Sequence, residues 1–568
     1  MTEELPGREE LVRWNESRPA NYYVASTNLR ETLDLRAGVE RRREMESRLH
    51  HFGAVVAEKL DPAVTALEHR RELPSFVPYD AVGRRVDQIE FDPEHFKATA
   101  AVWDSGLLAC DNGAGGSFEQ AALFYLLSHI GEGGLACPAV CTAGLGRAVA
   151  SRGSLDLQHR YLAGLRSAQY AGALRGSQFL TEVQGGSDVG ANLVGAVPDA
   201  EHNGAWRITG EKWFCSVADA DLFAVTARPE NAARGTRGLG CFLVPRTLDG
   251  ITPNGFRIRQ LKDKLGTRCL ASAEIDFDGA LGWPIGGIDE GFHVAVEELL
   301  NTSRWLNAVG STGLMRRAYL EAVTFARHRR AFGRTIGSIP IVREQLAMMK
   351  VEEYAALSST MALTGLVDRM DRGDASSRER AVHRFLVNVN KYRTSLTATD
   401  VVHQGIEILG GNGTIESFSV LPRLYRDAVV YESWEGTHNV LCAQVQRDCF
   451  KLNLLDDVAA WIGEELSNVG AMDTSVVEST ASVLVARFRD AVQAGEDGAG
   501  QLRRLLDRFA RLIQATTLLR ETSSSNDEKA AVTTMFIGRH LTDHDVGPSS
   551  SDIDRVLGDD LDESQGKP

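Results

Sequence analysis

The sequence predicts an α+β fold in which a small β-domain lies between two helical regions along the chain. Apolar residues recur at three- and four-residue spacing from residue 1 to about 174, and again from about 287 to 545. This spacing is typical of amphipathic helices. Between these regions, short runs rich in β-branched and aromatic residues alternate with polar turns over 175–286, which is the pattern of strands. A chain of 568 residues is also too long for one simple core, so several domains are expected.

Each region has its own characteristic segments. The predicted N-terminal helical domain, 1–174, contains "FEQAALFYLLSHI". The central β-domain, 175–286, contains "WRITGEKWF", "LFAVTA", "GCFLVP" and "SAEIDF" and is expected to form a small barrel or sandwich. Two long amphipathic stretches predict a four-helix-type bundle over 287–452, and a helical extension follows over 453–545. The acidic, apolar-poor tail, 546–568, is predicted to be disordered.

Composition and charge exclude several classes of function. The formal net charge is -15 and the pI is near 5.5, whereas binding to nucleic acid or anionic membranes requires a basic surface. The eight cysteines are scattered and no histidine joins them at ligand spacing, so no metal site is expected. No apolar run is long enough to cross a membrane, and the N-terminus is acidic and polar. We therefore expect a cytoplasmic protein with reduced thiols.

Two motifs in the β-domain are candidates for ligand binding. In "QFLTEVQGGSDVGAN", residues 178–192, Gly185 and Gly186 let a ligand approach the backbone, while Thr181 and Ser187 add hydroxyl groups. A plain turn between strands is the alternative interpretation. In "GEKWFCS", residues 210–216, two aromatic residues could form a stacking wall for a flat cofactor. The alternative there is a strand with a buried tryptophan.

Three further motifs lie in the predicted bundle. "ARHRRAFGRTIG", residues 326–337, has arginines suited to phosphate around Phe332, although they could simply interact with a helix dipole. "GIEILGGNGT", residues 405–414, is either a helix C-cap or a glycine turn that admits a pyrophosphate. "YESWEGTHN", residues 431–439, sets Glu435 beside Trp434. A carboxylate against an indole is costly unless it is paired or moves a proton.

Together and in this order, the five motifs resemble those of the acyl-CoA dehydrogenase family of flavoproteins. "TEVQGGSDV" resembles the family's T-E-x-x-x-G-S-D signature, and "KWFCS" its tryptophan strand. "RRAFG", "ILGGNG" and "WEGTHN" resemble its R-x-x-F-G, glycine-turn and Y-E-G-T elements, so the resemblance covers roughly residues 100–450. "LKDKLGTR", "GWPIGG" and "LPRLYRD" are most similar to the AidB-like branch. The resemblance implies an acyl-CoA dehydrogenase-like fold.

The resemblance also implies FAD as the cofactor and a homotetramer built as a dimer of dimers. Arg329, Phe332 and the 407–411 segment would reach the FAD from a neighbouring subunit. Many relatives carry a threonine that bonds flavin N5 where this chain has Cys215, and a thiol is a weaker donor. The residues implied to contact FAD are Phe179, Leu180, Thr181, Gly186, Ser187, Trp213, Phe214, Cys215, Ser216, Arg329, Phe332, Glu407, Gly410, Gly411, Trp434, Thr437 and Asn439.

The resemblance assigns Glu435 as the catalytic base for α,β-desaturation of an acyl thioester. Glu435 would take the α-proton while a β-hydride passes to flavin N5. Other branches carry the base on an earlier helix, but here Ser303 stands at that position, and Glu432 is the only nearby competitor. The implied substrate-binding residues are Ser187, Arg304, Trp434 and Gly436. The acyl group would be delivered by CoA or a carrier protein, and electrons would pass to an electron-transfer flavoprotein or O2.

Two alternatives remain open. One is a flavin-dependent oxidase or monooxygenase on the same fold, for which the departure at Cys215 leaves room. The other is an AidB-like, DNA-associated flavoprotein of the alkylation response. Arg504, Arg508 and Arg511 share a helix face in the extension, but a solvated face is the favoured interpretation. Residues 451–568 hold 21 acids against 12 bases, which opposes nucleic-acid binding.

Overall fold

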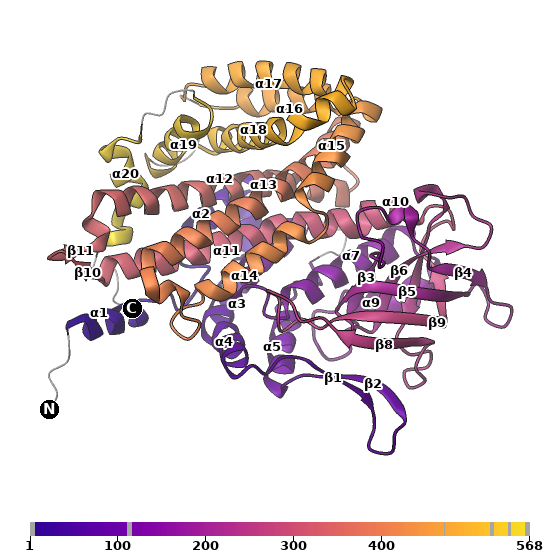
Figure 1. Ribbon diagram of the computed structural model, residues 1–568. Coiled ribbons are helices and arrows are strands. Elements are labelled where there is room, and N and C mark those ends of the chain that lie inside the picture. The colour runs from indigo at the N-terminus through magenta and orange to yellow at the C-terminus, as the bar shows by residue number, and fades with distance from the viewer. Residues whose placement is uncertain (1–5, 111–115, 471, 523–526, 543–546, 563–568) are drawn as a thin grey trace, which may run out of the picture. The chain divides into compact units, whose positions relative to one another are not determined.

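A computed structural model describes residues 6–110, 116–470, 472–522, 527–542 and 547–562 (Figure 1). The chain divides into two compact units. The helical unit consists of Met1–Glu58, Ser117–Gly131 and Asn307–Pro568, and the β-unit of Lys59–Gly116 and Glu132–Leu306. These units do not follow the predicted boundaries, because the 1–174 region contributes helices to both of them.

The helical unit is built on long helices that bury most of their length. α12 and α13 pack against each other, α14 packs on α13, and α2 and α6 pack on α12. A capping box starts α13, where the Ser376 hydroxyl accepts from the Glu379 amide at 3.2 Å and the Glu379 carboxylate accepts from the Ser376 amide at 2.8 Å. The helices are α1 (Pro6–Glu16), α2 (Thr27–Arg36), α3 (Val39–Val55), α6 (Ser117–Leu127), α11 (Asn301–His328), α12 (Pro340–Asp371), α13 (Ser377–Leu409), α14 (Leu421–Ser433) and α15 (His438–Leu452).

The predicted extension is mainly helical in its described residues. It consists of α16 (Leu454–Ser467), α17 (Ser475–Gln493), α18 (Glu496–Thr522) and α19 (Asp527–His540). α17 packs against α18, and α18 packs against α12, so the extension is part of the helical unit (Figure 1).

The prediction of a disordered tail is wrong for residues 547–562. This segment forms α20 (Ser550–Leu557) and a 3₁₀ turn (Gly558–Leu561), with Val556 and Leu557 buried. The Asp560 carboxylate accepts hydrogen bonds from Lys350 Nζ at 2.8 Å and Tyr319 Oη at 2.6 Å. The acidic composition suggested disorder, but Asp560 binds Lys350 and Tyr319, which are buried and lie far away in the sequence. The remaining tail positions, 546 and 563–568, lie outside the described residues.

A second correction concerns residues 75–90, which fall in the region predicted to be helical. They form an antiparallel hairpin of β1 (Ser75–Tyr79) and β2 (Arg85–Glu90). The Asp80 carboxylate starts the turn by accepting from the amides of Val82 at 3.0 Å and Arg84 at 2.9 Å. The helices of the β-unit are α4 (Asp61–Arg70), α5 (Pro93–Asp104), α7 (Ala136–Arg152) and the short α8 (Leu155–Leu157), α9 (Ala163–Leu165) and α10 (Gly291–Val294).

The β-domain is a small barrel. β6 pairs with β4 and β7, β4 pairs with β5, and β9 pairs with β5 and β7, which closes a ring of five strands. β3 adds to β6, and β8 adds to β9. Leu145 and Val149 of α7 pack on Leu222 and Leu243 of the barrel. The strands are β3 (Gly176–Phe179), β4 (Gly195–Pro198), β5 (Trp206–Ser216), β6 (Leu222–Pro229), β7 (Gly240–Pro245), β8 (Phe256–Leu261) and β9 (Ser272–Pro284).

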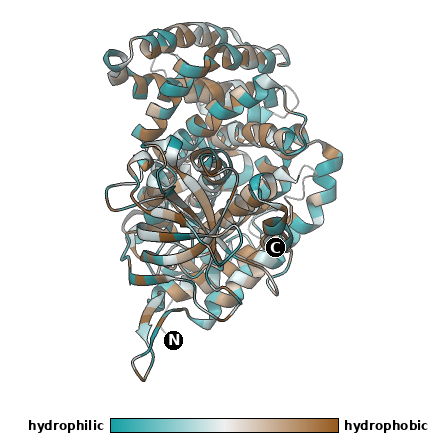
Figure 2. Ribbon diagram, turned by 90° about the vertical axis from the view of Figure 1, so that its right-hand side faces the viewer, coloured by the Kyte–Doolittle hydropathy of each residue, from teal (hydrophilic) through white to brown (hydrophobic). Residues whose placement is uncertain are grey.

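Hydrophobic and hydrophilic residues alternate along the strands and around the helices (Figure 2), as partly buried elements require. Within the described residues, no helix is both long and apolar enough to cross a membrane.

Candidate active site

A buried ion pair fixes the base of the glycine-rich loop in the β-unit. Lys212 of β5 is fully buried, and its Nζ lies 2.8 Å from Glu182 Oε1. The ammonium group also donates to the Leu180 carbonyl at 3.1 Å and the Thr226 hydroxyl at 3.2 Å. Burial alone would raise the pKa of Glu182, but the Lys212 charge and hydrogen bonds to the carboxylate lower it below the ordinary value. Burial lowers the pKa of Lys212, and the Glu182 charge opposes this shift, so each charge stabilises the other and the pair holds the loop in place.

The exposed part of this loop is where the sequence predicts flavin contacts. Gly186 and Ser187 are exposed, and the Thr181 side chain is half-buried. On the neighbouring strand Trp213 is half-buried and Phe214 is exposed, with the Thr181 carbonyl accepting from the Trp213 amide at 2.9 Å. The structure thus brings these predicted residues together at one edge of the barrel.

Lys262 lies over the aromatic pair Trp213 and Phe214. No motif in the sequence indicated this lysine. The ammonium nitrogen of Lys262 is 3.6 Å from the centre of the Trp213 ring and 5.7 Å from that of Phe214. This cation–π contact orients the indole. Lys262 also pairs with Glu274 at 2.9 Å, and Ser216 Oγ lies 2.9 Å from Ser272 Oγ.

Two other predicted cofactor residues have buried side chains. The Cys215 thiol donates to the Lys212 carbonyl at 3.6 Å, and burial raises its pKa, so it is an uncharged thiol at neutral pH. The Phe179 ring packs against Phe223 with centroids 4.9 Å apart. Their contacts with flavin stay predictions.

The start of α11 carries the alternative position for a base. Ser303 is fully buried, and its hydroxyl accepts from Gln178 Nε2 at 3.0 Å. Arg304, predicted to bind substrate, has only 3% of its surface exposed. Ser303 therefore accepts a hydrogen bond from β3, the strand that leads into the glycine-rich loop.

In the helical unit, Glu435 lies in a left-handed turn at the end of α14. The helix ends at Ser433, Trp434 adopts φ -65° and ψ 134°, and Glu435 has φ +59°. Gly436 follows with φ +107°. The left-handed conformation costs a non-glycine residue about 1–2 kcal/mol. Such strain concentrates at functional sites, where surrounding contacts maintain it.

The neighbouring acid, Glu432, is held away from this turn. Its Oε1 accepts from the Thr399 hydroxyl of α13 at 2.5 Å, and its Oε2 lies 3.4 Å from His438 Nε2. Burial raises the pKa of Glu432. Burial and nearby cations lower the pKa of His438 to about 4, so this imidazole is neutral at pH 7. Glu432, the competitor named from the sequence, thus faces α13.

Trp434 and Tyr431 form the wall beside Glu435. Their rings meet edge-to-face with centroids 5.2 Å apart. Tyr431 is fully buried, whereas Trp434 and Glu435 are half-buried. Thr437 and Asn439 are exposed, and Asn439 Oδ1 accepts from Arg503 of α18 at 3.2 Å. The helical extension thus reaches a residue predicted to hold FAD.

The R-x-x-F-G element forms a short hairpin of β10 (Arg330–Ala331) and β11 (Arg334–Thr335). Arg329 pairs with Glu10 of α1 at 3.2 Å, so its guanidinium is already engaged within the chain. Phe332, at the tip, is 95% exposed.

The glycine turn after α13 presents bare backbone. Gly410 has φ +60° and ψ -140°, a conformation open mainly to glycine. A Cβ added at Gly410 or Gly411 would meet nothing within 4 Å, so the backbone there lies open. Glu407 accepts from Gln345 Nε2 at 2.9 Å.

The arginines of α18 do not form one solvated face. Arg504 and Arg508 are exposed, as expected. Arg511 instead bonds to Asp507 at 3.3 Å and contacts His540, with only 17% of its side chain exposed. The expectation of a solvated face is therefore wrong for Arg511, because α19 covers it.

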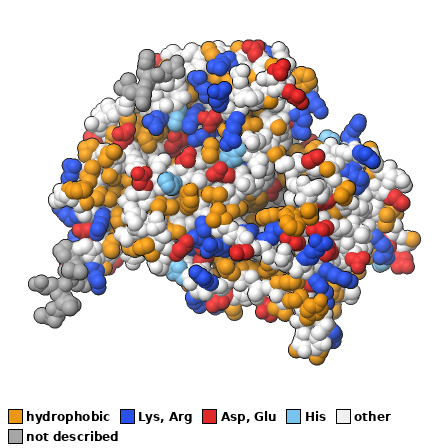
Figure 3. All heavy atoms as spheres, viewed as in Figure 1, with side chains coloured by type: hydrophobic (Ala, Val, Ile, Leu, Met, Phe, Trp, Pro, Cys, Tyr) orange, Lys and Arg blue, Asp and Glu red, His pale blue; other side chains and the backbone are white. Residues whose placement is uncertain are grey.

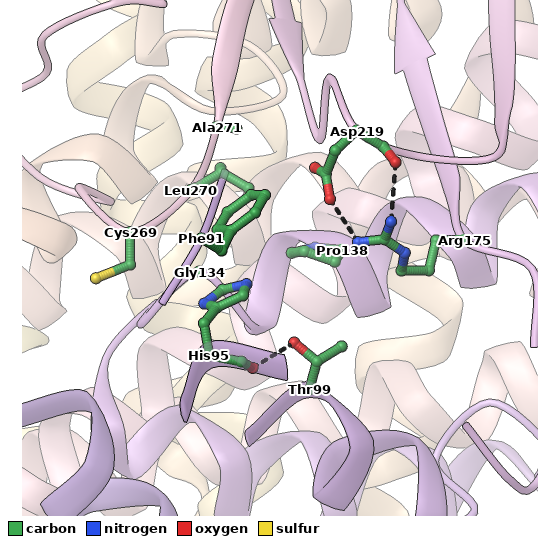
Figure 4. Close-up of a pocket in the computed structure, with 10 residues that line it drawn as sticks. All are labelled: Phe91, His95, Thr99, Gly134, Pro138, Arg175, Asp219, Cys269, Leu270 and Ala271. Atoms are coloured by element: carbon green, nitrogen blue, oxygen red, sulfur yellow. Dashed lines mark hydrogen bonds and ion pairs between the residues drawn. The ribbon is translucent and has the colours of Figure 1, made fainter. Parts of the chain in front are cut away.

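A small hollow lies elsewhere in the β-unit (Figure 4). His95 stacks on Phe91 with ring centroids 4.5 Å apart, and Arg175 pairs with Asp219 at 2.5 Å on another side. Burial lowers the pKa of His95 to about 4. None of the site residues predicted from the sequence lines this hollow. Among the described residues, no group of three or more His, Cys, Asp or Glu could hold a metal ion.

A β-barrel that lies between helical regions along the chain, together with an acid-bearing turn and a glycine-rich loop, defines a flavoenzyme of the acyl-CoA dehydrogenase type. Family profiles match three consecutive parts of the chain. They are the N-terminal domain of the adaptive response protein AidB over 15–172, the acyl-CoA dehydrogenase middle domain over 177–280 and the acyl-CoA dehydrogenase C-terminal domain over 289–450. The chain belongs to the acyl-CoA dehydrogenase family, whose members are FAD-dependent oxidoreductases. The predicted family, branch and fold class are confirmed.

Individual relatives agree. AidB of Escherichia coli K12 is 33% identical over 386 residues, covering 66% of this chain and 69% of the relative. Acyl-CoA dehydrogenase family member 11 of Caenorhabditis elegans is 31% identical over 499 residues, covering 83% of this chain and 79% of the relative. The crystal structure of C. elegans ACDH-11 in complex with C11-CoA has a TM-score of 0.85 and 28% identity, covering 93% of this chain and 94% of that one.

Proposed function

We propose that the chain desaturates an acyl-CoA thioester between its α and β carbons with Glu435 as the base. The observation that carries this proposal is the arrangement of the acids around the α14 turn. Glu432 is bonded to Thr399 and faces α13, and Ser303 replaces the base at the alternative position. Of these three residues, Glu435 is the one that combines a half-buried side chain, aromatic neighbours in the sequence and a strained backbone.

The reaction requires a base because the α-proton of a thioester is only weakly acidic. A carboxylate held at the α-carbon removes this proton as negative charge develops on the thioester oxygen. The backbone N–H of Glu435 is the proposed donor to that oxygen, so one residue would supply both the base and the hydrogen bond. Trp434 and Tyr431 limit access of water to the carboxylate. Bound FAD supplies the acceptor for the β-hydride.

Several observations fit a bound FAD. The half-buried Trp213 and the exposed Phe214 offer an aromatic surface to the flat ring system. The open backbone at Gly410 and Gly411 admits a phosphate or ribose without steric conflict. We propose that Thr181, Ser187, Thr437 and Asn439 provide polar contacts to the cofactor.

We further propose a homotetramer in which Arg329 and Phe332 contact the FAD of a neighbouring subunit. The 95% exposure of Phe332 supports this assembly, because the ring would be covered by the neighbouring chain. Glu10 already pairs with Arg329, so an FAD phosphate would have to share or displace that contact. Light scattering of the FAD-loaded protein should give the mass of four chains, and a monomer that retains FAD would contradict the assembly.

The ACDH-11 complex with C11-CoA supports CoA as the carrier of the acyl group. A carrier-protein thioester remains the alternative, and the proposed electron acceptor is an electron-transfer flavoprotein or O2. Nucleic acid is not a favoured partner, because the net charge is -15 and acidic and basic side chains are interspersed on the face in Figure 3. A cytoplasmic location is proposed from the eight cysteines, which are all buried thiols.

Replacing Glu435 by glutamine tests the assignment of the base. Glu435→Gln is nearly isosteric, so it should keep FAD and bind acyl-CoA. Loss of the base should slow anaerobic flavin bleaching by an acyl-CoA panel by about 10²–10⁴-fold or more. Glu432→Gln is the matched control, because its carboxylate faces α13, and it should cost much less. Flavin reduction by Glu435→Gln at the wild-type rate would overturn the proposal and favour the oxidase alternative.

A further inference from the structure

A buried lysine of α13 holds both ends of the turn that contains Glu435. Lys391 is fully buried, and its Nζ donates to the Glu432 carbonyl at 2.8 Å and to the Gly436 carbonyl at 2.8 Å. Burying an ammonium group is costly unless its donors are satisfied. Here two of the three donors go to backbone oxygens, one on each side of Glu435.

The end of α14 needs such donors. The last carbonyls of a helix have no partner within the helix, and a cation there interacts favourably with the helix dipole. Asn307 Nδ2 donates to the Tyr431 carbonyl at 3.1 Å, and Lys391 takes the next carbonyl, that of Glu432. The Lys391 bond to Gly436 has no such explanation, because that residue lies beyond the helix.

The bond to Gly436 closes the segment that contains the strained backbone of Glu435. Glu435 adopts φ +59°, which a side-chain-bearing residue keeps only where its surroundings enforce it. Binding the carbonyls of Glu432 and Gly436 to one ammonium group holds the 432–433 and 436–437 peptide groups, which bracket the short segment that contains the strained residue. The Glu435 side chain and its backbone N–H both lie between these two anchors.

We propose that Lys391 is a positioning residue for the desaturation, holding Glu435 in its left-handed conformation. This inference rests on the proposed role of Glu435 as the base. Lys391 would act on the base and on the N–H donor together, because both belong to the residue between the two carbonyls. Its loss should impair proton abstraction while leaving the groups proposed to bind FAD in place.

Lys391→Met tests this in the FAD-loaded protein, because it removes the charge and all three donors while keeping most of the side-chain volume. The saturating rate of anaerobic flavin reduction per bound FAD should fall by about 10–10²-fold, since small misplacements of reacting groups have effects of this size. Amide hydrogen exchange over 433–437 should become faster. Lys529→Met is the control: Lys529 is also buried in the helical unit and pairs with Glu521 at 2.9 Å. It should reduce stability without changing the rate per bound FAD.

A 3-thia-acyl-CoA adds a readout that structural loss alone would not change. Its α-proton is more acidic, so the absorbance change on binding to oxidised FAD reports proton removal without hydride transfer. Lys391→Met should bind this analogue with a weaker absorbance change. Should Lys391→Met not retain FAD, Lys391→Gln, whose amide can donate to one carbonyl, should give a smaller loss of rate.

The outcomes separate the two proposals. A wild-type reduction rate in Glu435→Gln would refute the proposed base, whatever Lys391 does. An inactive Glu435→Gln combined with wild-type rates per bound FAD in the Lys391 variants would overturn the positioning role alone.

Discussion

Replacing Glu182 by glutamine should selectively destabilise the β-unit. The change leaves the Lys212 ammonium fully buried with neutral acceptors alone, namely the new side-chain amide oxygen, the Leu180 carbonyl at 3.1 Å and the Thr226 hydroxyl at 3.2 Å. Removing one partner of a buried ion pair typically costs about 3–5 kcal/mol. The Glu182 carboxylate also accepts from the Leu193 amide at 2.6 Å, so the far end of the glycine-rich loop loses a charged acceptor as well.

Hydrogen exchange measures this cost locally, which matters because a chain with two units need not unfold in one step. A loss of about 3–5 kcal/mol should accelerate exchange of the most protected amides of β5 and β6 by roughly 10²–10³·⁵, since about 1.4 kcal/mol corresponds to a factor of ten. The exchange rates of amides in α12 and α13 should change far less.

Asp278→Asn is the control for charge removal within the same barrel. Asp278 pairs with Arg257 at 3.7 Å, with side-chain exposures of 73% and 61%, and exposed pairs contribute little. If Glu182→Gln changes exchange no more than Asp278→Asn does, the buried pair does not stabilise the barrel and the reasoning is refuted. Glu182→Leu combined with Lys212→Met should recover part of the loss, because no unpaired charge remains.

Two further predictions concern the helical unit. Asp560→Asn should lower the stability of the helical unit by about 1–3 kcal/mol, because the carboxylate accepts from both Lys350 and Tyr319. Thermal melting measures the loss. An equal loss in Asp559→Asn, where the side chain is exposed, would contradict the prediction. Burial alone would raise the pKa of Glu352, but His540 and Arg511 lower it to about 2 from an ordinary 4.5. This depressed pKa contributes stability above about pH 4.5 that is lost as the pH falls toward 2. Glu352→Gln should therefore make the free energy of unfolding depend less on pH in this window. An unchanged pH dependence would show that the contacts of Glu352 with His540 and Arg511 do not contribute to stability.

The sequence predicted the order of helices and strands because their periodicities differ strongly. It could not predict the closure of the barrel, which depends on β6 pairing with strands on both sides. The hairpin at 75–90 was missed because two strands of five and six residues are too short to stand out in a region where helical spacing dominates. The tail was misjudged because acidic composition says nothing about Lys350, which lies 210 residues from Asp560.

The candidate site was predicted unevenly for similar reasons. Glu435 and the glycines could be found because short motifs contain them. Lys212 lies inside a quoted motif, but only the fold shows that it meets Glu182, 30 residues away. Lys391 had no local signal, since "NVNKYRT" reads as an ordinary stretch of amphipathic helix.

The discontinuous helical unit has a consequence for synthesis. Arg36 of α2 bonds to Glu521 of α18 at 3.1 Å, and 485 residues separate them. At about 5–20 residues per second, a ribosome needs roughly 25–100 s to cover this distance. Throughout that time Arg36 lacks its partner on α18, and α2 waits until residue 371 for the end of α12, on which it packs, whereas the barrel strands all emerge within residues 176–284. The nascent chain should therefore depend on chaperones mainly through its first 58 residues, and the barrel should form first.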